Sequence, residues 1–270
     1  MRALVLILSL AFAPLAAPAW EPDGQEVDLE LVLLVDVSRS MSPDELEIQR
    51  RGYAEALISD EVVAAIRGGM IGRVALSYVE WAGAQAQRTA VPWTLIESRE
   101  DAAAFAARIE GNATAAMRRT SISGALLFAA ESFEENGFSG LRRVIDVSGD
   151  GPNNAGRPVR LARDTALARG ITINGLPLMT DTGALQVWDI PDLDTYYTEC
   201  VIGGPGAFVL PVRGWDAFAD AVRRKMVMEI AGDMQPARLW RAQARPRTQP
   251  YDCMVGEKIW ERYRRYWGAP

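Results

Sequence analysis

Continuous apolar runs alternate along this chain with segments in which apolar residues recur every three or four positions. The clearest run covers 30–35 and stops at Asp36, and further runs cover 73–79, 143–147 and 171–176. A long apolar run rich in β-branched residues is typical of a strand that is buried on both faces of a parallel sheet. We therefore expect these segments to be sheet strands. A shorter segment at 91–95, which contains Pro92, fits an edge strand. The segment 207–210 fits a last strand.

The segments between these strands have helical spacing. The first of these helices has a clear start, because Ser42 can cap it, Pro43 suits its first turn and Glu45 completes a capping box. Strands that alternate with helices predict an α/β fold, a doubly wound and mainly parallel sheet with helices on both faces. We expect further helices at 101–109, 121–133, 158–168 and 215–231, the last one ended by Gly232, and an irregular segment at 179–206.

The N-terminus has the features of a secretory signal peptide. Arg2 is followed by an apolar run over 3–15 and by the small-x-small sequence Ala17-Pro18-Ala19. The alternative, a membrane anchor, is disfavoured because the run is too short to span a bilayer, and no later apolar run is longer. We expect a signal peptide at 1–19, a single domain at 20–232 and a basic, aromatic extension at 233–270 packed on that domain. The protein would be exported, to the periplasm or outside the cell.

Composition excludes several kinds of function. The 270 residues are 49% hydrophobic, enough for one generous core, and carry a formal charge of −6, which becomes −7 when Arg2 is removed. An acidic chain of this kind is not expected to bind nucleic acid. Because the chain has no histidine, it cannot use Ser-His-Asp or Cys-His hydrolysis or a histidine-ligated zinc site.

The two cysteines, Cys200 and Cys253, fit an oxidising compartment and are expected to form a disulfide bond. The alternative is two separate buried thiols. The extension that contains Cys253 is expected to pack on the domain through its aromatic residues. A cationic, aromatic docking arm is the other possibility for it.

Oxygen-bearing side chains gather where the predicted strands end or the helices begin. Asp36, Ser38 and Ser40 follow the first long strand, Thr120 precedes a helix, and Asp150 follows the strand at 143–147. A parallel sheet would bring these positions to one edge. Carboxylates and hydroxyls are hard ligands that suit Mg²⁺ or Mn²⁺. Taken singly, each of these residues could also be an ordinary turn or helix cap.

These motifs resemble the von Willebrand factor A (VWA) domain and its metal-ion-dependent adhesion site (MIDAS), whose pattern is Asp-x-Ser-x-Ser, then a Thr, then an Asp. The resemblance covers roughly residues 28–231. More closely, the segments 78–81, 120–124 and 146–154 are similar to those of exported bacterial VWA-type proteins with no assigned function. The resemblance implies the Rossmann-like VWA fold and a non-catalytic, metal-dependent adhesion or scaffold function.

The resemblance also implies a role for each residue of the site. Ser38 and Ser40 would ligate the metal through their hydroxyls, Asp36 would act through a water, and Thr120 would bind directly or through a water. Asp150 would be an outer carboxylate. A protein partner would complete the ion with the carboxylate of a Glu or Asp.

One position departs from the family pattern, which often has glycine between the two serines, where this chain has Arg39. A large cation there would screen the metal or recruit an acidic partner. Arg39, Glu80, Trp81 and Asn153 are expected to form the rim that contacts the partner.

Three other interpretations fit parts of the sequence. The loop at 149–154 resembles that of haloacid-dehalogenase-like phosphatases, but Ser38 stands where those enzymes have a second Asp, and Asn154 replaces the last Asp of their loop. A dinucleotide site lacks its Gly-x-Gly-x-x-Gly sequence after the first strand. A degenerate VWA scaffold that binds no metal is supported by Arg39.

Overall fold

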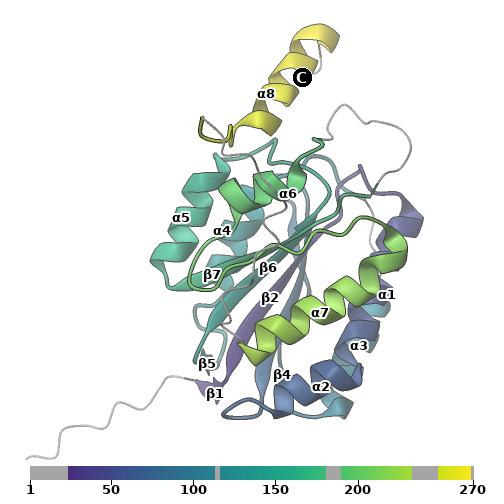
Figure 1. Cartoon of the computed structure of the whole chain (residues 1–270), viewed down its shortest axis with the longest axis vertical. Coiled ribbons are helices and arrows are strands. Elements are labelled where there is room, and N and C mark those ends of the chain that lie inside the picture. The colour runs from purple at the N-terminus through teal and green to yellow at the C-terminus, as the bar shows by residue number, and fades with distance from the viewer. Residues whose placement is uncertain (1–23, 113–115, 181–189, 233–248, 269–270) are drawn as a thin grey trace, which may run out of the picture.

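The computed structural model describes residues 24–112, 116–180, 190–232 and 249–268. A five-stranded sheet forms the centre of the molecule, in the order β4-β3-β2-β6-β7 (Figure 1). All neighbouring strands are parallel except β3 and β4. The expected fold class is therefore confirmed. The strands are β2 (Leu29–Asp36), β3 (Val74–Trp81), β4 (Gln87–Ile96), β6 (Arg143–Gly149) and β7 (Ile171–Pro177).

Helices cover both faces of this sheet (Figure 1). One face packs against α1 (Pro43–Leu57), α2 (Asp60–Arg67), α3 (Arg99–Glu110) and α7 (Phe218–Ala231). The other face packs against α4 (Ile122–Ser132), α5 (Val159–Ala168), α6 (Leu193–Tyr196) and the π-helix η1 (Tyr197–Val201). Because both faces are covered, all eight residues of β2 are buried, as its apolar sequence predicts.

The strand register places the ends of the central strands together. Asp36 at the end of β2 pairs with Trp81 at the end of β3, and Val35 pairs with Ser148 of β6. The loops that follow β2 and β6 therefore leave the sheet side by side. This C-terminal edge is where open α/β sheets hold ligands.

Two helix boundaries follow the sequence signals. Ser42 accepts a hydrogen bond from the backbone of Glu45, and the Glu45 carboxylate accepts one from the backbone of Ser42 at 2.7 Å, which completes the capping box. Helix α7 ends at Gly232, whose φ of 61° is left-handed. Glycine adopts this conformation without steric cost.

The structure differs from the sequence expectations in several short elements. The segment 207–210 is not a regular strand and forms only an isolated bridge from Val209 to Gly175, and the segment 179–206 is not wholly irregular, since it includes α6 and η1. The short parallel pair of β1 (Gln25–Val27) and β5 (Phe138–Gly140) was not expected, nor was α2. Strands of three residues are too short to show a hydrophobic period.

The C-terminal extension contains α8 (Val255–Trp267), which projects from the C-terminal edge of the sheet (Figure 1). Within the described residues, no helix is long and apolar enough to cross a membrane. The expected signal peptide at 1–19 and the segment 233–248 lie outside the described residues.

Candidate metal centre

Four of the five expected metal-site residues form a continuous hydrogen-bonded chain. The backbone N–H of Ser38 donates to Asp36 Oδ1 at 2.7 Å, and the hydroxyls of Ser38 and Ser40 lie 2.8 Å apart. Ser40 Oγ then donates to Asp150 Oδ1 at 2.9 Å. The loops after β2 and β6 thus bring their oxygen-bearing side chains together, although Ser40 and Asp150 are 110 residues apart in sequence.

Thr120, the fifth residue, lies on a third loop, which is hydrogen-bonded to the loop after β2 and to the loop after β6. Its backbone N–H donates to Asn154 Oδ1 at 3.0 Å, and the N–H of Asn154 donates to the carbonyl of Thr120 at 2.8 Å. Three residues earlier, the N–H of Met117 donates to the carbonyl of Val37 at 2.9 Å. All three loops therefore meet at the edge where β2 and β6 end.

The Asp36 carboxylate is the least satisfied group of this site. Its side chain is fully buried, and its Oδ2 has no hydrogen-bond partner. Burial raises the pKa of Asp36 well above its usual value, and the nearby charge of Asp150 raises it further, whereas the bonds from Ser38 act in the opposite direction. A buried carboxylate oxygen of this kind is stabilised either by a proton or by a cation.

Gly149 leaves room for this oxygen. A Cβ at position 149 would lie 2.9 Å from Asp36 Oδ2, 2.9 Å from the hydroxyl of Tyr197 and 3.1 Å from the ring of Trp81. Any larger residue would push against the Asp36 carboxylate. The glycine that ends β6 is thus required by the close approach of the two strand ends.

The donor set fits a hard divalent ion. Two carboxylates and three hydroxyls supply only oxygen atoms, which suit Mg²⁺ and Mn²⁺. Among the described residues there is no group of three or more His, Cys, Asp or Glu that could hold a metal. A metal site at this edge would therefore depend on serine and threonine hydroxyls, which would leave a divalent ion only partly neutralised.

The expected partner-binding rim is exposed only at Arg39. Trp81 and Asn153 are fully buried, and Glu80 is buried and ion-paired with Arg88 at 2.5 Å. The expectation that these three residues lie exposed at the rim is therefore wrong in this structure. Glu80 and Trp81 end a strand that is covered on both faces, and Asn153 lies beneath α8.

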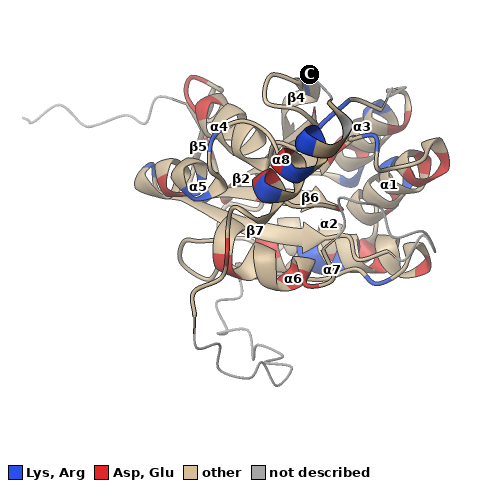
Figure 2. Ribbon diagram, turned by 90° about the horizontal axis from the view of Figure 1, so that it is seen from above, with Lys and Arg blue, Asp and Glu red and all other residues tan. Residues whose placement is uncertain are grey.

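Helix α8 contacts two of the loops that form the site (Figure 2). The Trp260 ring stacks on the guanidinium of Arg119, 3.3 Å from Cζ to the ring centroid, and Arg119, next to Thr120, has a left-handed φ of 76°. Glu257 Oε1 accepts from Asn153 Nδ2 at 2.7 Å. Gly256 lies so close that a Cβ there would be 2.2 Å from the carbonyl oxygen of Asn153.

The expected disulfide is confirmed and holds the start of α8. Cys200 at η1 and Cys253 are joined, with their Cα atoms 5.5 Å apart. Nearby, the hydroxyl of Tyr251 donates to Asp192 at 3.1 Å. The sequence reasoning expected the extension to pack on the domain but missed the helix, whose signal is the helical spacing of Val255, Ile259 and Tyr263.

A five-stranded α/β sheet with these motifs at its edge defines a VWA-type domain, and solved structures support that class. The proximal thread matrix protein 1 (PTMP1) of the mussel byssus is similar over 77% of this chain and 49% of its own, with a TM-score of 0.57 and 19% identity. BatB from Bacteroides thetaiotaomicron is similar over 76% of this chain and 99% of its own, with a TM-score of 0.51 and 18% identity. A von Willebrand factor type A protein from Catenulispora acidiphila is similar over 76% of this chain and 43% of its own, with a TM-score of 0.51 and 15% identity.

The chain belongs to the family described as "Protein of unknown function (DUF1194)", whose sequence model matches residues 26–234. This match covers all the residues of the candidate metal centre and ends before α8. The chain spans about half of the mussel protein to which it is similar. No curated protein matches the sequence.

Proposed function

We propose that this protein is an exported, non-catalytic binding domain that holds Mg²⁺ or Mn²⁺ at the C-terminal edge of its sheet. It would recognise a protein partner through an acidic side chain of that partner. The single observation that carries this proposal is the buried and unpartnered Oδ2 of Asp36, beside the hydroxyls of Ser38 and Ser40. An isolated buried carboxylate is costly, and a divalent ion offsets that cost.

Each residue of the site would have its own role in binding the ion. Ser38 and Ser40 would ligate the ion through their hydroxyls, with Thr120 on the facing loop. Asp36 and Asp150 would supply negative charge beside it. Asp150 Oδ1 accepts from the Ser40 hydroxyl and orients it, whereas Asp36 Oδ1 accepts from the backbone N–H of Ser38 and holds the loop. When bound, the ion supplies a positive charge that accepts a carboxylate ligand.

The comparisons support the proposal at the level of the class. One structure of PTMP1, similar with a TM-score of 0.52, is described as having a zinc-occupied MIDAS motif. Another similar structure, with a TM-score of 0.53, is the pilus adhesin SpaC of Lactobacillus rhamnosus. Zn²⁺ therefore belongs among the ions to be tested alongside Mg²⁺ and Mn²⁺.

The test is calorimetric titration of Mg²⁺, Mn²⁺ and Zn²⁺ into chelator-treated mature protein, with Asp36→Ala and Asp60→Ala alongside. Asp60 is a matched control because its side chain is 91% exposed at the start of α2. We expect saturable binding in the parent and in Asp60→Ala, and none in Asp36→Ala. Equal binding in all three proteins would disprove the proposed site, and absence of binding in the parent would favour a scaffold without metal.

Export is tested separately, because it rests on the N-terminal sequence alone. We expect protein produced with its full N-terminus in a bacterial host to be recovered from the periplasm or the medium, with a new N-terminus at or near Trp20. Recovery of the uncleaved chain from the cytoplasm would contradict export without affecting the metal site.

A further inference from the structure

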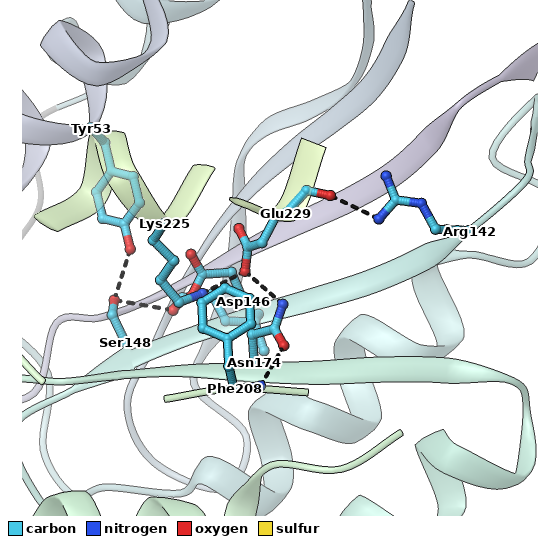
Figure 3. Close-up of polar contacts among 9 residues, drawn as sticks. Tyr53, Arg142, Asp146, Ser148, Asn174, Phe208, Lys225 and Glu229 are labelled. Atoms are coloured by element: carbon cyan, nitrogen blue, oxygen red, sulfur yellow. Dashed lines mark hydrogen bonds and ion pairs between the residues drawn. The ribbon is translucent and has the colours of Figure 1, made fainter. Parts of the chain in front are cut away.

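A second polar group lies inside the molecule, away from the metal centre. Lys225 and Glu229 of α7 meet Asp146 of β6 and Asn174 of β7 between the helix and the sheet (Figure 3). Lys225 is 0% exposed, Asp146 1%, Glu229 2% and Asn174 3%. We call these four residues the buried lysine cluster. The proposed metal-dependent binding makes no use of them.

The lysine amine touches both carboxyl groups. Lys225 Nζ lies 2.6 Å from Asp146 Oδ1 and 2.5 Å from Glu229 Oε1. Asn174 holds Glu229 in place, since its Nδ2 donates to Glu229 Oε1 at 2.9 Å while its Oδ1 accepts from the backbone of Phe208 at 3.1 Å. The amine and the Asp146 carboxyl are therefore in contact, with a third, oriented carboxyl group beside them.

The cluster contains more carboxyl groups than cations. Burial raises the pKa of Asp146, and burial together with the charge of Asp146 raises the pKa of Glu229 to about 7. Glu229 Oε2 has no hydrogen-bond partner. A proton is thus readily held within the cluster, and a buried carboxyl group that carries it can pass it on.

Aromatic side chains enclose the cluster. The Phe208 ring centroid lies 5.4 Å from Lys225 Nζ. On another side, Tyr53 is fully buried, contacts Phe218 edge-on at 5.8 Å and donates from its hydroxyl to Ser148 at 3.2 Å (Figure 3). The Asp146 charge is among the causes that raise the pKa of Tyr53, after burial. The amine of Lys225 and the carboxyl group of Asp146 are therefore in contact at a site that is buried from solvent.

We propose that Lys225 and Asp146 condense to an intramolecular amide, with Glu229 as the proton carrier. Two reactive groups held in contact react as if at very high concentration. Exclusion of bulk water disfavours hydrolysis of the product. The bond would join α7 covalently to the central strand β6.

The reaction balances without any further reactant. Lys225 Nζ transfers a proton to the Asp146 carboxylate by way of Glu229, which leaves a neutral amine and a carboxylic acid. The amine lone pair attacks Cγ of Asp146 and a C–N bond forms. A C–O bond then breaks, and the hydroxyl leaves as water with a proton from Glu229, which regains one from the attacking nitrogen. Nothing is oxidised or reduced.

The test is mass spectrometry of the full chain after reduction and alkylation of the disulfide. We expect a mass lower than that of the sequence by one water. Trypsin should release a branched peptide in which 144–160 is joined to 225–238. An unmodified sequence mass, with 144–160 and 226–238 released as separate peptides because trypsin cleaves after a free Lys225, would overturn the proposal. Loss of ammonia in the parent would also overturn it, because Asn174 would then be the acceptor.

Three variants separate the roles of the residues, each checked for folding by circular dichroism. Lys225→Arg removes the amine and should show the full sequence mass. Glu229→Gln keeps both reacting groups and should also show the full mass; a branched peptide in that variant would overturn the role of Glu229. Asp146→Asn should lose ammonia instead of water and give the same product mass as the parent, and an unreacted mass in a folded Asp146→Asn variant would count against this acceptor position.

Discussion

The candidate metal centre and the buried lysine cluster each contain a pair of carboxyl groups, but among the described residues only the second pair contacts a buried lysine. Asp36 lies beside Asp150 at the end of β2, and Asp146 lies beside Glu229 in the middle of β6. Burial and the charge of Asp150 raise the pKa of Asp36, and burial and the charge of Asp146 raise the pKa of Glu229. Lys225 contacts both members of the second pair, whereas no lysine or arginine among the described residues forms an ion pair with Asp36.

Position in the sheet explains this difference. Asp146 pairs in register with Leu33 and Asn174 in the body of the sheet, where α7 covers it and can provide a lysine. Asp36 is the last residue of β2, so its carboxylate lies where the loops after β2 and β6 meet and none of the described helices provides a lysine. We therefore expect opposite effects on stability. Removal of the Lys225 cation should lower the free energy of unfolding, whereas removal of the Asp36 charge should raise it in the absence of metal.

The largest effect is expected from removal of the internal cation. Lys225→Met removes the group that would form the amide and leaves two buried carboxyl groups, Asp146 and Glu229, without any cation, so it should lower the free energy of unfolding by about 3–5 kcal/mol. Urea denaturation measures this, with Arg224→Met as the matched control on the exposed side of the same helix; the control should change stability by no more than ~0.5 kcal/mol. Similar stability of the two variants would show that Lys225 does not neutralise the pair.

Loss of the disulfide should cause the next largest loss of stability. This bond holds the start of α8, which contacts the loops of the candidate metal centre. The bond closes a separation of 53 residues, so the double variant Cys200→Ser, Cys253→Ser should lose up to about 4 kcal/mol of stability. Amide exchange should show faster opening of α8 than of α7. If α8 stays protected in the double variant, its contacts with the Arg119 and Asn153 loops are sufficient to hold it.

The third prediction concerns removal of a carboxylate from the pair that lacks an internal cation. Because the folded-state pKa of Asp36 is raised, the contribution of this group to the stability of chelated protein should be fully present below the ordinary value of 3.8 and should be lost as the pH rises through the folded pKa. At pH 8 in chelator, Asp36→Asn should therefore raise the thermal midpoint by about 3 °C.

Thermal melts of Asp36→Asn and the parent at several pH values check this sign. The two midpoints should converge as the pH falls. A lower midpoint for the variant at pH 8 would mean that the charged form of Asp36 is stabilised in the absence of metal, and the contrast between the two clusters would fail.

The smallest effect is expected at α8. Trp260→Ala removes the ring stacked on Arg119 and frees the loop that carries Thr120, so metal affinity should fall by roughly threefold. Tyr266→Ala is the matched control, since its side chain is 86% exposed on the same helix. Calorimetric titration of the two variants compares them, and equal affinities would show that α8 does not position the Thr120 loop.

The sequence predicted the elements that depend on long patterns. β2 and β6 were visible as apolar runs because both faces of the sheet are covered, and α1 was visible from its capping box. The gathering of Asp36, Ser38, Ser40, Thr120 and Asp150 was also predictable, because parallel strands place such loops at one edge. The hydrogen-bonded chain of Asp36, Ser38, Ser40 and Asp150 agrees with that expectation, while binding of the ion stays a prediction.

Other features depend on contacts between distant residues. Glu80 and Trp81 end β3 just as Asp36 ends β2, and nothing in the local sequence shows that both side chains are covered. Asn153 was expected at the surface because the sequence does not show that α8 lies over it. The buried lysine cluster was missed for the same reason, since Lys225 is a single charge in a helix whose buried face becomes known only when it packs on β6.

The arrangement of the two ends has a practical consequence for orientation. The described chain begins at β1, at the end of the sheet opposite to α8 and the metal centre (Figure 1). A surface coupled through residues before β1 would present the hydroxyl-lined edge to the solution, whereas coupling through the last residues of α8 would hold that edge against the support. Chips and beads for partner searches should therefore be loaded through the N-terminal side.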